Sequence, residues 1–359
     1  MENSIEFSIF IKSAKIMTIK KGAYFTDIHF GRRNSCAIHN QDCTDFIEWF
    51  CGNVRKDPSI TYIAFLGDFF ENRAHINILT LSMAYKALKM LDDLGLPIYF
   101  VVGNHDLHRR STREIFSTEV FGQFKNIILV SEPLVVENEI LFCPFLFPDE
   151  YKDLSQYGNI PIWAGHFEFR NFMITGYNLV MEHGPDHRVF KDAKHIFCGH
   201  FHKRQAKDNV CYIGNTFPMD FGDSGDTARG MMVFDHTTDE VDFTDWSNGP
   251  TYLKTTLSKA LADDWLIQPS DRMRVICTND IELSYSEAQV VKETLKEQYK
   301  FREFKLEENY SARKEAIEDS VIEDMGSFTL DEFVITALES IKEVKNIKND
   351  RLINIYKNL

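Results

Sequence analysis

The sequence predicts an α/β fold in which two β-sheets face each other and helices flank them, followed by a small α/β unit and a C-terminal helical tail. Three observations support this prediction. A strand–helix–strand pattern fills the first third of the chain, and a series of short apolar runs typical of strands follows it. The 359 residues, of which 44% are hydrophobic, are enough to bury the cores of two or three such units.

The first sheet is predicted from the N-terminal third of the chain. It begins with a strand at residues 22–26 and continues with a βαβ unit, whose strands at 62–66 and 98–102 flank an amphipathic helix at 77–94. Residues 37–50 have the pattern of another helix. The second sheet is expected to contain short strands at 127–131, 134–137, 140–143, 161–165, 195–199, 209–214 and 230–235.

A turn signal at Gly249 and Pro250 ends the first predicted domain. Beyond it, a strand at 272–278, a helix at 286–299 and a strand at 301–306 predict a small α/β domain. Two apolar stretches after Thr329 predict short helices, which gain stability by docking against a partner or against the body of this chain. The expected organisation is an N-terminal extension at 1–16, a main domain at 17–250, a small domain at 251–310 and a C-terminal helical segment at 311–359.

Five short polar motifs stand out, and four of them directly follow a predicted strand. They are Asp27-Ile28-His29, Gly67-Asp68, Gly103-Asn104-His105-Asp106, Gly165-His166 and Gly199-His200-Phe201-His202. The loops after strand ends are where α/β sheets build active sites. Each motif alone is also typical of an ordinary turn or surface loop. Their joint occurrence in one chain favours a shared site.

The residue types in these motifs indicate a centre for two metal ions. Two carboxylates, one amide and four imidazoles suit divalent transition ions better than magnesium or calcium in a cage of oxygen atoms. Seven ligands cannot surround two ions fully, so open positions remain for a water that loses a proton and for the phosphate oxygens that it attacks. Asp68, alone in its loop, is the candidate for the carboxylate shared by both ions.

The complete series of motifs resembles the calcineurin-like metallophosphoesterases and, within them, the Mre11/SbcD nucleases, and it implies their layered sandwich. By this resemblance His105 would be the general acid or phosphate-positioning group, and Asp106 would orient it. The ordinary alternative for His105 is a loop imidazole that bonds to the backbone. The implied ligands are Asp27, His29, Asp68 and His202 for one metal, and Asp68, Asn104, His166 and His200 for the other.

Residues around the motifs separate a nuclease from a protein phosphatase. Phosphatases of this superfamily carry G-D-x-x-D-R-G and an arginine before G-N-H, whereas this chain has G-D-F-F-E-N-R at 67–73 and Val102 before Gly103. The sequence G-D-x-F-E resembles the G-D-[LIV]-F-[DE/H] of Mre11/SbcD nucleases, and Arg229-Gly230 resembles their R-G strand. The likeness covers roughly the first 245 residues and is greatest to the recombination endonuclease subunits of T4-type bacteriophages.

The resemblance implies a Mn²⁺-dependent DNA exonuclease and endonuclease with two Mn²⁺ per chain, for which Mg²⁺ could substitute. The small domain would cap the site, and the segment at 311–359 would bind a Rad50/SbcC-like SMC-type ATPase. A homodimer is expected, which could form through the helices at 37–50 or 78–94. The expected location is the cytoplasm, or the host cytoplasm if a phage encodes the protein. Two alternatives are a stand-alone nucleotide phosphodiesterase or phosphatase, and a structural adaptor with idle metals, which the intact ligands argue against.

The formal net charge of −14 does not favour a nucleic-acid substrate, because a protein gains affinity for nucleic acid by neutralising its phosphates. Basic pairs next to three of the motifs could form a local phosphate track, or they could be solvated loop charges. An acidic body would also make the chain a poor DNA binder by itself, which suits dependence on a partner. The candidate DNA-binding residues are Arg32, Arg33, Arg109, Arg110, Lys203 and Arg204.

Other signals exclude several classes of protein. Seven cysteines without regular spacing predict a reducing cytoplasm rather than disulfides. Cys36, His39 and Cys43 could suggest zinc, but this spacing in a helix is more typical of packing. No apolar run approaches a membrane span. The chain has no G-x₄-G-K-[ST] loop, so any ATP dependence would come from another subunit.

Overall fold

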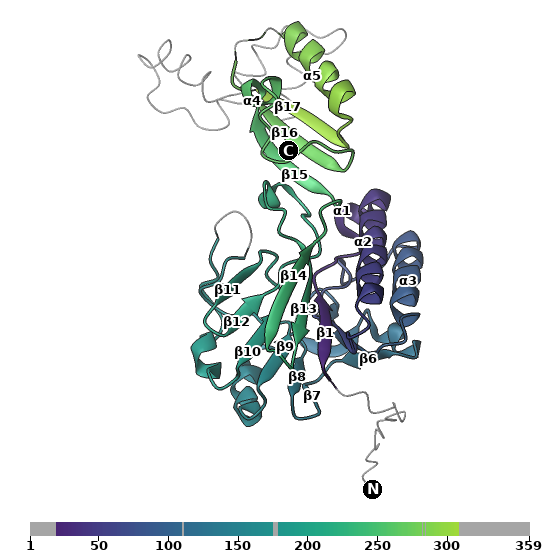
Figure 1. Cartoon of the computed structure of the whole chain (residues 1–359), viewed down its shortest axis with the longest axis vertical. Helices are drawn as coiled ribbons and strands as arrows, with labels where there is room; N and C mark the ends of the chain where they lie inside the picture. Colours follow the sequence, from purple (N-terminus) through teal and green to yellow (C-terminus); the bar gives the residue numbers. More distant parts are fainter. Residues whose placement is uncertain (1–18, 110, 175–178, 282, 284, 309–359) are drawn as a thin grey trace, which may run out of the picture.

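The structure, a computed structural model, describes residues 19–109, 111–174, 179–281, 283 and 285–308 (Figure 1).

The first of two large sheets contains four parallel strands and two antiparallel strands at one edge. The sheet order is β14 (Glu240–Asp245), β13 (Gly230–Asp235), β1 (Lys21–Phe25), β2 (Tyr62–Phe65), β3 (Ile98–Val101) and β6 (Ile127–Val130). Strands β1, β2, β3 and β6 are parallel, and β13 and β14 run antiparallel to their neighbours.

The second sheet faces the first. Its order is β11 (Gln205–Lys207), β12 (Val210–Tyr212), β10 (His195–Cys198), β9 (Ile162–Gly165), β8 (Ile140–Cys143) and β7 (Leu134–Val136). The four central strands are parallel, and both edge strands are antiparallel. Aromatic rings fill the space between the sheets: Tyr99 of β3 stacks on Phe142 of β8 with centroids 4.2 Å apart. The predicted layered sandwich is therefore confirmed.

Two strands were assigned to the wrong sheet in the sequence analysis. The segments 127–131 and 230–235 were expected in the second sheet, but β6 pairs with β3 and β13 pairs with β1, both in the first. Buried strands of both sheets have the same apolar composition, so their sequences do not indicate which neighbour they join. Strand β14 was not predicted at all, because its side chains are mostly exposed and include Glu240, Asp242 and Asp245.

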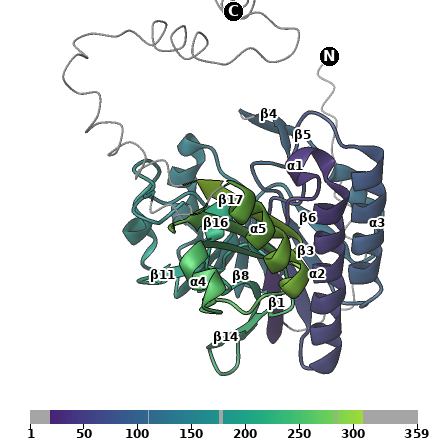
Figure 2. The same cartoon turned by 90° about the horizontal axis from the view of Figure 1, so that it is seen from above.

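Helices α2 (Ala37–Lys56) and α3 (Ile78–Asp92) cover the outer face of the first sheet (Figures 1 and 2). Helix α2 is longer than the predicted 37–50, and it packs Phe46 and Phe50 against Phe25 of β1. The helices run parallel, since Asn40 Nδ2 donates to Thr80 Oγ1 near their first turns and Cys51 contacts the Met90 carbonyl further along. Asn77 caps α3 by accepting a hydrogen bond from the Leu79 amide.

No helix in the described part of the chain is long and apolar enough to cross a membrane.

Shorter elements connect the two sheets and the helices that cover them. The connecting elements are α1 (Arg32–Ser35), the hairpin of β4 (Leu107–Arg109) and β5 (Thr112–Phe116), and the 3₁₀ helices η1 (Glu119–Gln123), η2 (Pro148–Tyr157), η3 (His187–Phe190) and η4 (Phe221–Asp223).

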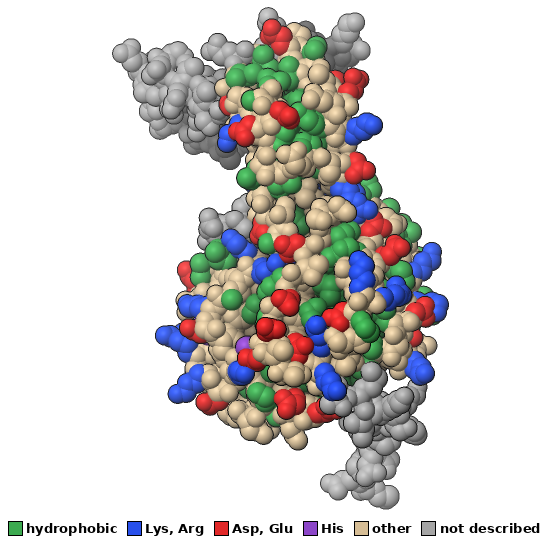
Figure 3. All heavy atoms as spheres, viewed as in Figure 1, with side chains coloured by type: hydrophobic (Ala, Val, Ile, Leu, Met, Phe, Trp, Pro, Cys, Tyr) green, Lys and Arg blue, Asp and Glu red, His purple; other side chains and the backbone are tan. Residues whose placement is uncertain are grey.

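The small α/β domain begins directly after Pro250, forms a separate lobe (Figure 3) and has a core of its own. Its parallel sheet contains β15 (Thr251–Thr256), β16 (Met273–Asn279) and β17 (Glu303–Glu308), with helices α4 (Leu257–Leu261) and α5 (Tyr285–Tyr299). Leu257, Val275, Leu295 and Phe304 form part of the core. Strand β15 was missing from the sequence prediction, whereas β16, α5 and β17 lie close to the predicted segments.

Ion pairs join the small domain to helix α2. Asp42, which is only 2% exposed, accepts from Arg302 Nη1 at 2.6 Å. Arg272 pairs with Asp45 and lies over the Trp246 ring at 5.5 Å. A cavity of about 640 Å³ between Trp49, Trp246 and residues 267–272 adjoins these pairs. The joint is therefore polar, as is typical of interfaces between domains of one chain.

Candidate metal centre

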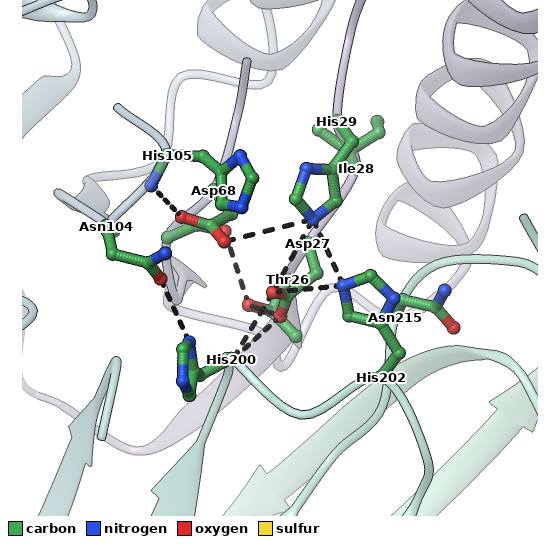
Figure 4. A network of polar contacts seen from close by, with 12 residues as sticks. Thr26, Asp27, Ile28, His29, Asp68, Asn104, His105, His200, His202 and Asn215 are labelled. Atoms are coloured by element: carbon green, nitrogen blue, oxygen red, sulfur yellow. Dashed lines mark hydrogen bonds and ion pairs between the residues drawn. The ribbon is translucent and has the colours of Figure 1, made fainter. Parts of the chain in front are cut away.

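The five motifs lie at the carboxyl ends of β1, β2, β3, β9 and β10. Figure 4 shows side chains of four of them, including Asp27, Asp68 and His202, turned toward one another. The Asp27 amide donates to the Gly67 carbonyl at 3.0 Å, and the Gly199 amide donates to the Gly165 carbonyl at 2.9 Å. These bonds hold the strand ends side by side. Residues that are up to 175 positions apart in the sequence thus form one cluster of buried and half-buried side chains.

Backbone conformation at the strand ends explains the glycines and carries strain. Gly67 has φ +103°, and a Cβ there would lie 2.4 Å from His166 Nδ1, so only glycine fits. Asp27, Asp68 and His200 also have positive φ values of 50°, 60° and 89°. Left-handed conformations of such residues cost free energy and concentrate at functional sites, where the surrounding structure enforces them.

Three groups of side chains in the described residues could hold a metal ion, and two of them consist of predicted ligands, whereas the third is His29, Glu71 and His105. The first cluster of predicted ligands contains Asp27, His29 and His202. The Nε2 atoms of His29 and His202 are 3.1 Å apart, and each lies 3.9 Å from Asp27 Oδ1. The Nδ1 atom of His29 is 2.9 Å from the Glu71 carboxylate, which favours the proton on Nδ1 and leaves an Nε2 lone pair that points into the cluster. This arrangement suits a cation between the two rings.

The second cluster contains Asp68, His166 and His200, with Asn104 among them. Asn104 Oδ1 lies 2.8 Å from His166 Nε2 and 2.9 Å from His200 Nδ1. The other nitrogen of each ring has its own acceptor. His166 Nδ1 donates to the Leu66 carbonyl at 2.7 Å, and His200 Nε2 lies 3.0 Å from the Glu168 carboxylate. Outer partners of this kind orient imidazoles for metal ligation.

Asp68 lies between the two clusters. Its Oδ2 atom is 3.4 Å from His166 Nε2 in one cluster and 3.8 Å from His29 Nε2 in the other. Its Oδ1 atom accepts from the His105 amide at 2.8 Å. Among the seven predicted ligands, Asp68 thus has the position expected of a carboxylate shared by two ions.

The buried charges also fit a cation. Burial opposes a high pKa at His166, but the carboxylates of Asp68 and Asp27 raise that pKa to about 9. Burial likewise opposes a low pKa at Asp68, yet the His166 and His29 rings hold it well below its usual range. The cluster therefore favours positive charge next to its carboxylates. A divalent ion would supply that charge in place of the ring proton.

His105 is close to the clusters and is held by the backbone. Its ring lies 5.0 Å from the His29 ring, and its Nδ1 atom is 2.9 Å from the Glu71 carbonyl. The Nδ1–H group therefore donates to this carbonyl, and Nε2 would be the atom that could contact a reacting group. Burial lowers the pKa of His105, although the Asp68 carboxylate raises it.

Asp106 does not have the position that the sequence analysis expected. Its carboxylate was expected to orient His105, but both its oxygens instead accept hydrogen bonds from backbone amides at 3.0–3.3 Å. The donors belong to Asp68, Phe69, Phe70 and Gly103. Asp106 thus fixes the loop that carries Asp68, and the Glu71 carbonyl is the group that orients the His105 ring. Local sequence could not show this, because three of the four amide donors come from the loop after another strand, β2.

Three supporting residues were missed as functional groups. Glu71 contacts His29 through its carboxylate and His105 through its carbonyl, and Glu168 contacts His200. Thr26 Oγ1 donates to Asp27 Oδ2 at 2.6 Å. Glu71 and Glu168 stand three and two positions after candidate ligands, so an acidic residue in the same loop was the available signal.

Three arginines among the six residues predicted to bind DNA form polar contacts within the protein. Arg32 pairs with Asp220 and Arg204 pairs with Asp245, each at 2.8 Å, while Arg33 donates to the Met219 carbonyl. Arg109 is exposed and Lys203 is half-buried. Arg110 lies outside the described residues.

The Cys and His side chains that could have suggested zinc lie at the start of α2 or within it. The His39 ring hydrogen-bonds to the His29 carbonyl, and the Cys43 thiol donates to the Ile28 carbonyl. Cys36 directly precedes α2.

A layered α/β sandwich with two adjacent Asp/His clusters at its strand ends defines a metal-dependent phosphoesterase. A sequence model of the calcineurin-like phosphoesterases matches residues 23–204, and the chain belongs to this family.

Among curated proteins, exonuclease subunit 1 of Enterobacteria phage T4 is 29% identical over 196 residues. The match covers 53% of this chain and 57% of the T4 protein, so it spans a little over half of that relative. Similar solved structures include a dimetal phosphatase from Danio rerio, with 8% identity over 60% of this chain and 92% of that one at a TM-score of 0.38. They also include the Pseudomonas putida nuclease MPE, with 16% identity over 53% and 66% at a TM-score of 0.26.

Proposed function

We propose that the chain is a Mn²⁺-dependent DNA exonuclease and endonuclease subunit that acts in the processing of DNA ends during recombination and repair. The position of Asp68 between two clusters of metal-ligating side chains carries the proposal. The similarity to a phage exonuclease subunit supports a nucleic-acid substrate. A mixed set of imidazole and carboxylate ligands suits Mn²⁺, with Mg²⁺ as a substitute.

The protein groups would act on a phosphodiester in defined ways. When bound, two divalent ions would supply an acidified water and positive charge for the phosphate oxygens. Asp27, His29, Asp68 and His202 would hold one ion, and Asp68, Asn104, His166 and His200 the other. The Nε2 atom of His105 would hydrogen-bond the phosphate or donate a proton to the leaving oxygen, while the Glu71 carbonyl keeps the ring in place. Burial opposes the protonated ring, and a nearby anionic phosphate would favour it.

The function is tested by incubating the purified chain, with and without a Rad50/SbcC-like ATPase, with four substrates in Mn²⁺ or Mg²⁺. These are end-labelled single-stranded DNA, duplex DNA, cyclic nucleotides and p-nitrophenyl phosphate. Cleavage of DNA in Mn²⁺, well above that of the small esters, is the expected result. Rapid hydrolysis of nucleotides without DNA cleavage would instead favour the stand-alone phosphodiesterase.

We also propose that the segment at 311–359, which lies outside the described residues, binds the ATPase subunit. Removing the residues after Glu323 is expected to leave cleavage of single-stranded DNA within about twofold, because every candidate ligand precedes this point. Binding of the ATPase, measured by calorimetry, should be lost. Unchanged binding by the truncated chain would contradict this assignment.

A homodimer through the start of α2 and α3 is supported by exposed apolar side chains. Ile78 is 85% exposed and Tyr85 54% on α3, and Ile38 is 49% exposed on α2. The contact of Asn40 with Thr80 places the first turns of both helices together. Exposed apolar side chains on two adjacent helices favour an interface.

Ile78→Glu is therefore expected to weaken dimerisation by about 10- to 100-fold, since burying an isoleucine contributes about 1.5–3 kcal/mol. Analytical ultracentrifugation across a concentration series gives the dissociation constant. Val290→Glu, at a side chain 67% exposed on α5 of the small domain, is the matched control. Equal effects of the two substitutions would exclude this face.

A further inference from the structure

We propose that the ring of Phe145 is a stacking platform for a nucleobase next to the cleaved phosphate. This base-binding subsite rests on the proposed function and narrows the class of DNA that would be cleaved. A base must be unpaired or unstacked to reach a protein ring. The preferred substrate would then be single-stranded DNA or a frayed duplex end.

Phe145 lies directly beside the metal ligands. Its ring centroid is 5.8 Å from that of His200 and 6.2 Å from that of His166. The Phe145 amide donates to the Val102 carbonyl at 2.9 Å, two residues before Asn104. The backbone that carries the ring is therefore fixed relative to the second cluster, and a nucleotide whose phosphate reaches this cluster would bring its base close to the ring.

The backbone of Phe145 is also anchored on its other side. Arg113 Nη1 donates to the Phe145 carbonyl at 2.8 Å, and the same guanidinium pairs with Glu150. Arg113 lies over the ring of Phe147 at 5.0 Å, and that ring meets Phe145 edge-on with centroids 6.1 Å apart. Because Glu150 neutralises Arg113, this cluster supports the ring of Phe145 rather than attracting phosphate.

Part of the Phe145 ring is accessible next to the candidate ligands. Phe30, Phe69 and Phe167 are fully buried, whereas Phe145 is half-buried, as is the neighbouring Phe147 that supports it. A ligand that covers the accessible part of the ring would gain the free energy of burying it. A base offers a flat π-face of any sequence, and stacking on an aromatic side chain contributes about 1–3 kcal/mol.

The test combines protein variants with altered DNA. Phe145→Leu and Phe145→Tyr are compared with the wild type on a single-stranded oligonucleotide that has one cleavage position, in Mn²⁺. A second set of oligonucleotides carries an abasic residue on one side or the other of the cleaved phosphate. Phe301→Leu, at a half-buried ring of the small domain, is the matched control. Bound metal and melting temperature are measured for every variant.

Phe145→Leu is expected to lower kcat/KM about tenfold, mainly through KM, while Phe145→Tyr stays within about twofold of the wild type. One abasic position should lower the wild-type value by the same factor and leave Phe145→Leu unaffected. Equal losses for normal and abasic DNA, or loss of metal from Phe145→Leu, would overturn the stacking role alone. A wild-type chain that cleaves no DNA would overturn the proposed function and this subsite together.

Discussion

Asp68→Asn is expected to reduce phosphodiester hydrolysis by about a thousandfold or more and to weaken the binding of both metal ions. A single outer partner of a metal ligand already contributes roughly 10- to 100-fold. Asp68 lies within 3.8 Å of both clusters, so its substitution removes negative charge from both sites at once. Calorimetric titration with Mn²⁺ and hydrolysis of labelled DNA measure the two effects.

The control for Asp68→Asn is Asp153→Asn, at an exposed carboxylate on η2. It should leave metal binding and hydrolysis unchanged. If Asp68→Asn lost only one of two metal ions, the shared position assigned to this carboxylate would be wrong. Full activity at the usual Mn²⁺ concentration would exclude Asp68 as a ligand altogether.

His105→Ser is expected to keep both metal ions and to lower the rate of cleavage by about 10²- to 10⁴-fold, the usual contribution of a general acid. The substitution preserves the amide that donates to Asp68 Oδ1, so the shared carboxylate stays in place. It removes the ring whose Nε2 atom is proposed to act on the phosphodiester. Metal stoichiometry and single-turnover cleavage, measured on the same preparation, separate the two effects.

His108→Ser, at an exposed imidazole on β4, is the matched control for His105→Ser. It should cleave DNA at the wild-type rate. Loss of a metal ion from His105→Ser would place His105 among the ligands, since its ring also lies within reach of His29 and Glu71. His105 would then not be the general acid.

Two contacts of Glu71 connect these predictions. Its carboxylate is near His29, and its carbonyl accepts from His105, so one residue supports a candidate ligand and the candidate acid. Burial opposes a low pKa at Glu71, but the neighbouring His29 and Arg32 lower it to about 2. The carboxylate therefore stays ionised and continues to orient His29 at neutral pH.

The sequence by itself located the candidate metal centre and much of the fold. Helical sequence patterns located α2, α3 and α5, and the strand-end motifs contained the seven candidate ligands that the structure brings together. Such inferences succeed because helix periodicity and the residues that follow a strand are local properties, readable within a few positions.

Only the tertiary structure decided which distant groups meet. It placed β6 and β13 in the first sheet, assigned Asp106 to backbone amides, and paired Arg32 and Arg204 with acidic partners. It also placed Phe145 beside His200. Alternation of apolar residues tells which face of a segment is buried, but the partner on that face depends on how sheets pair and pack. Those contacts join residues far apart in the chain, and no local sequence pattern predicts them.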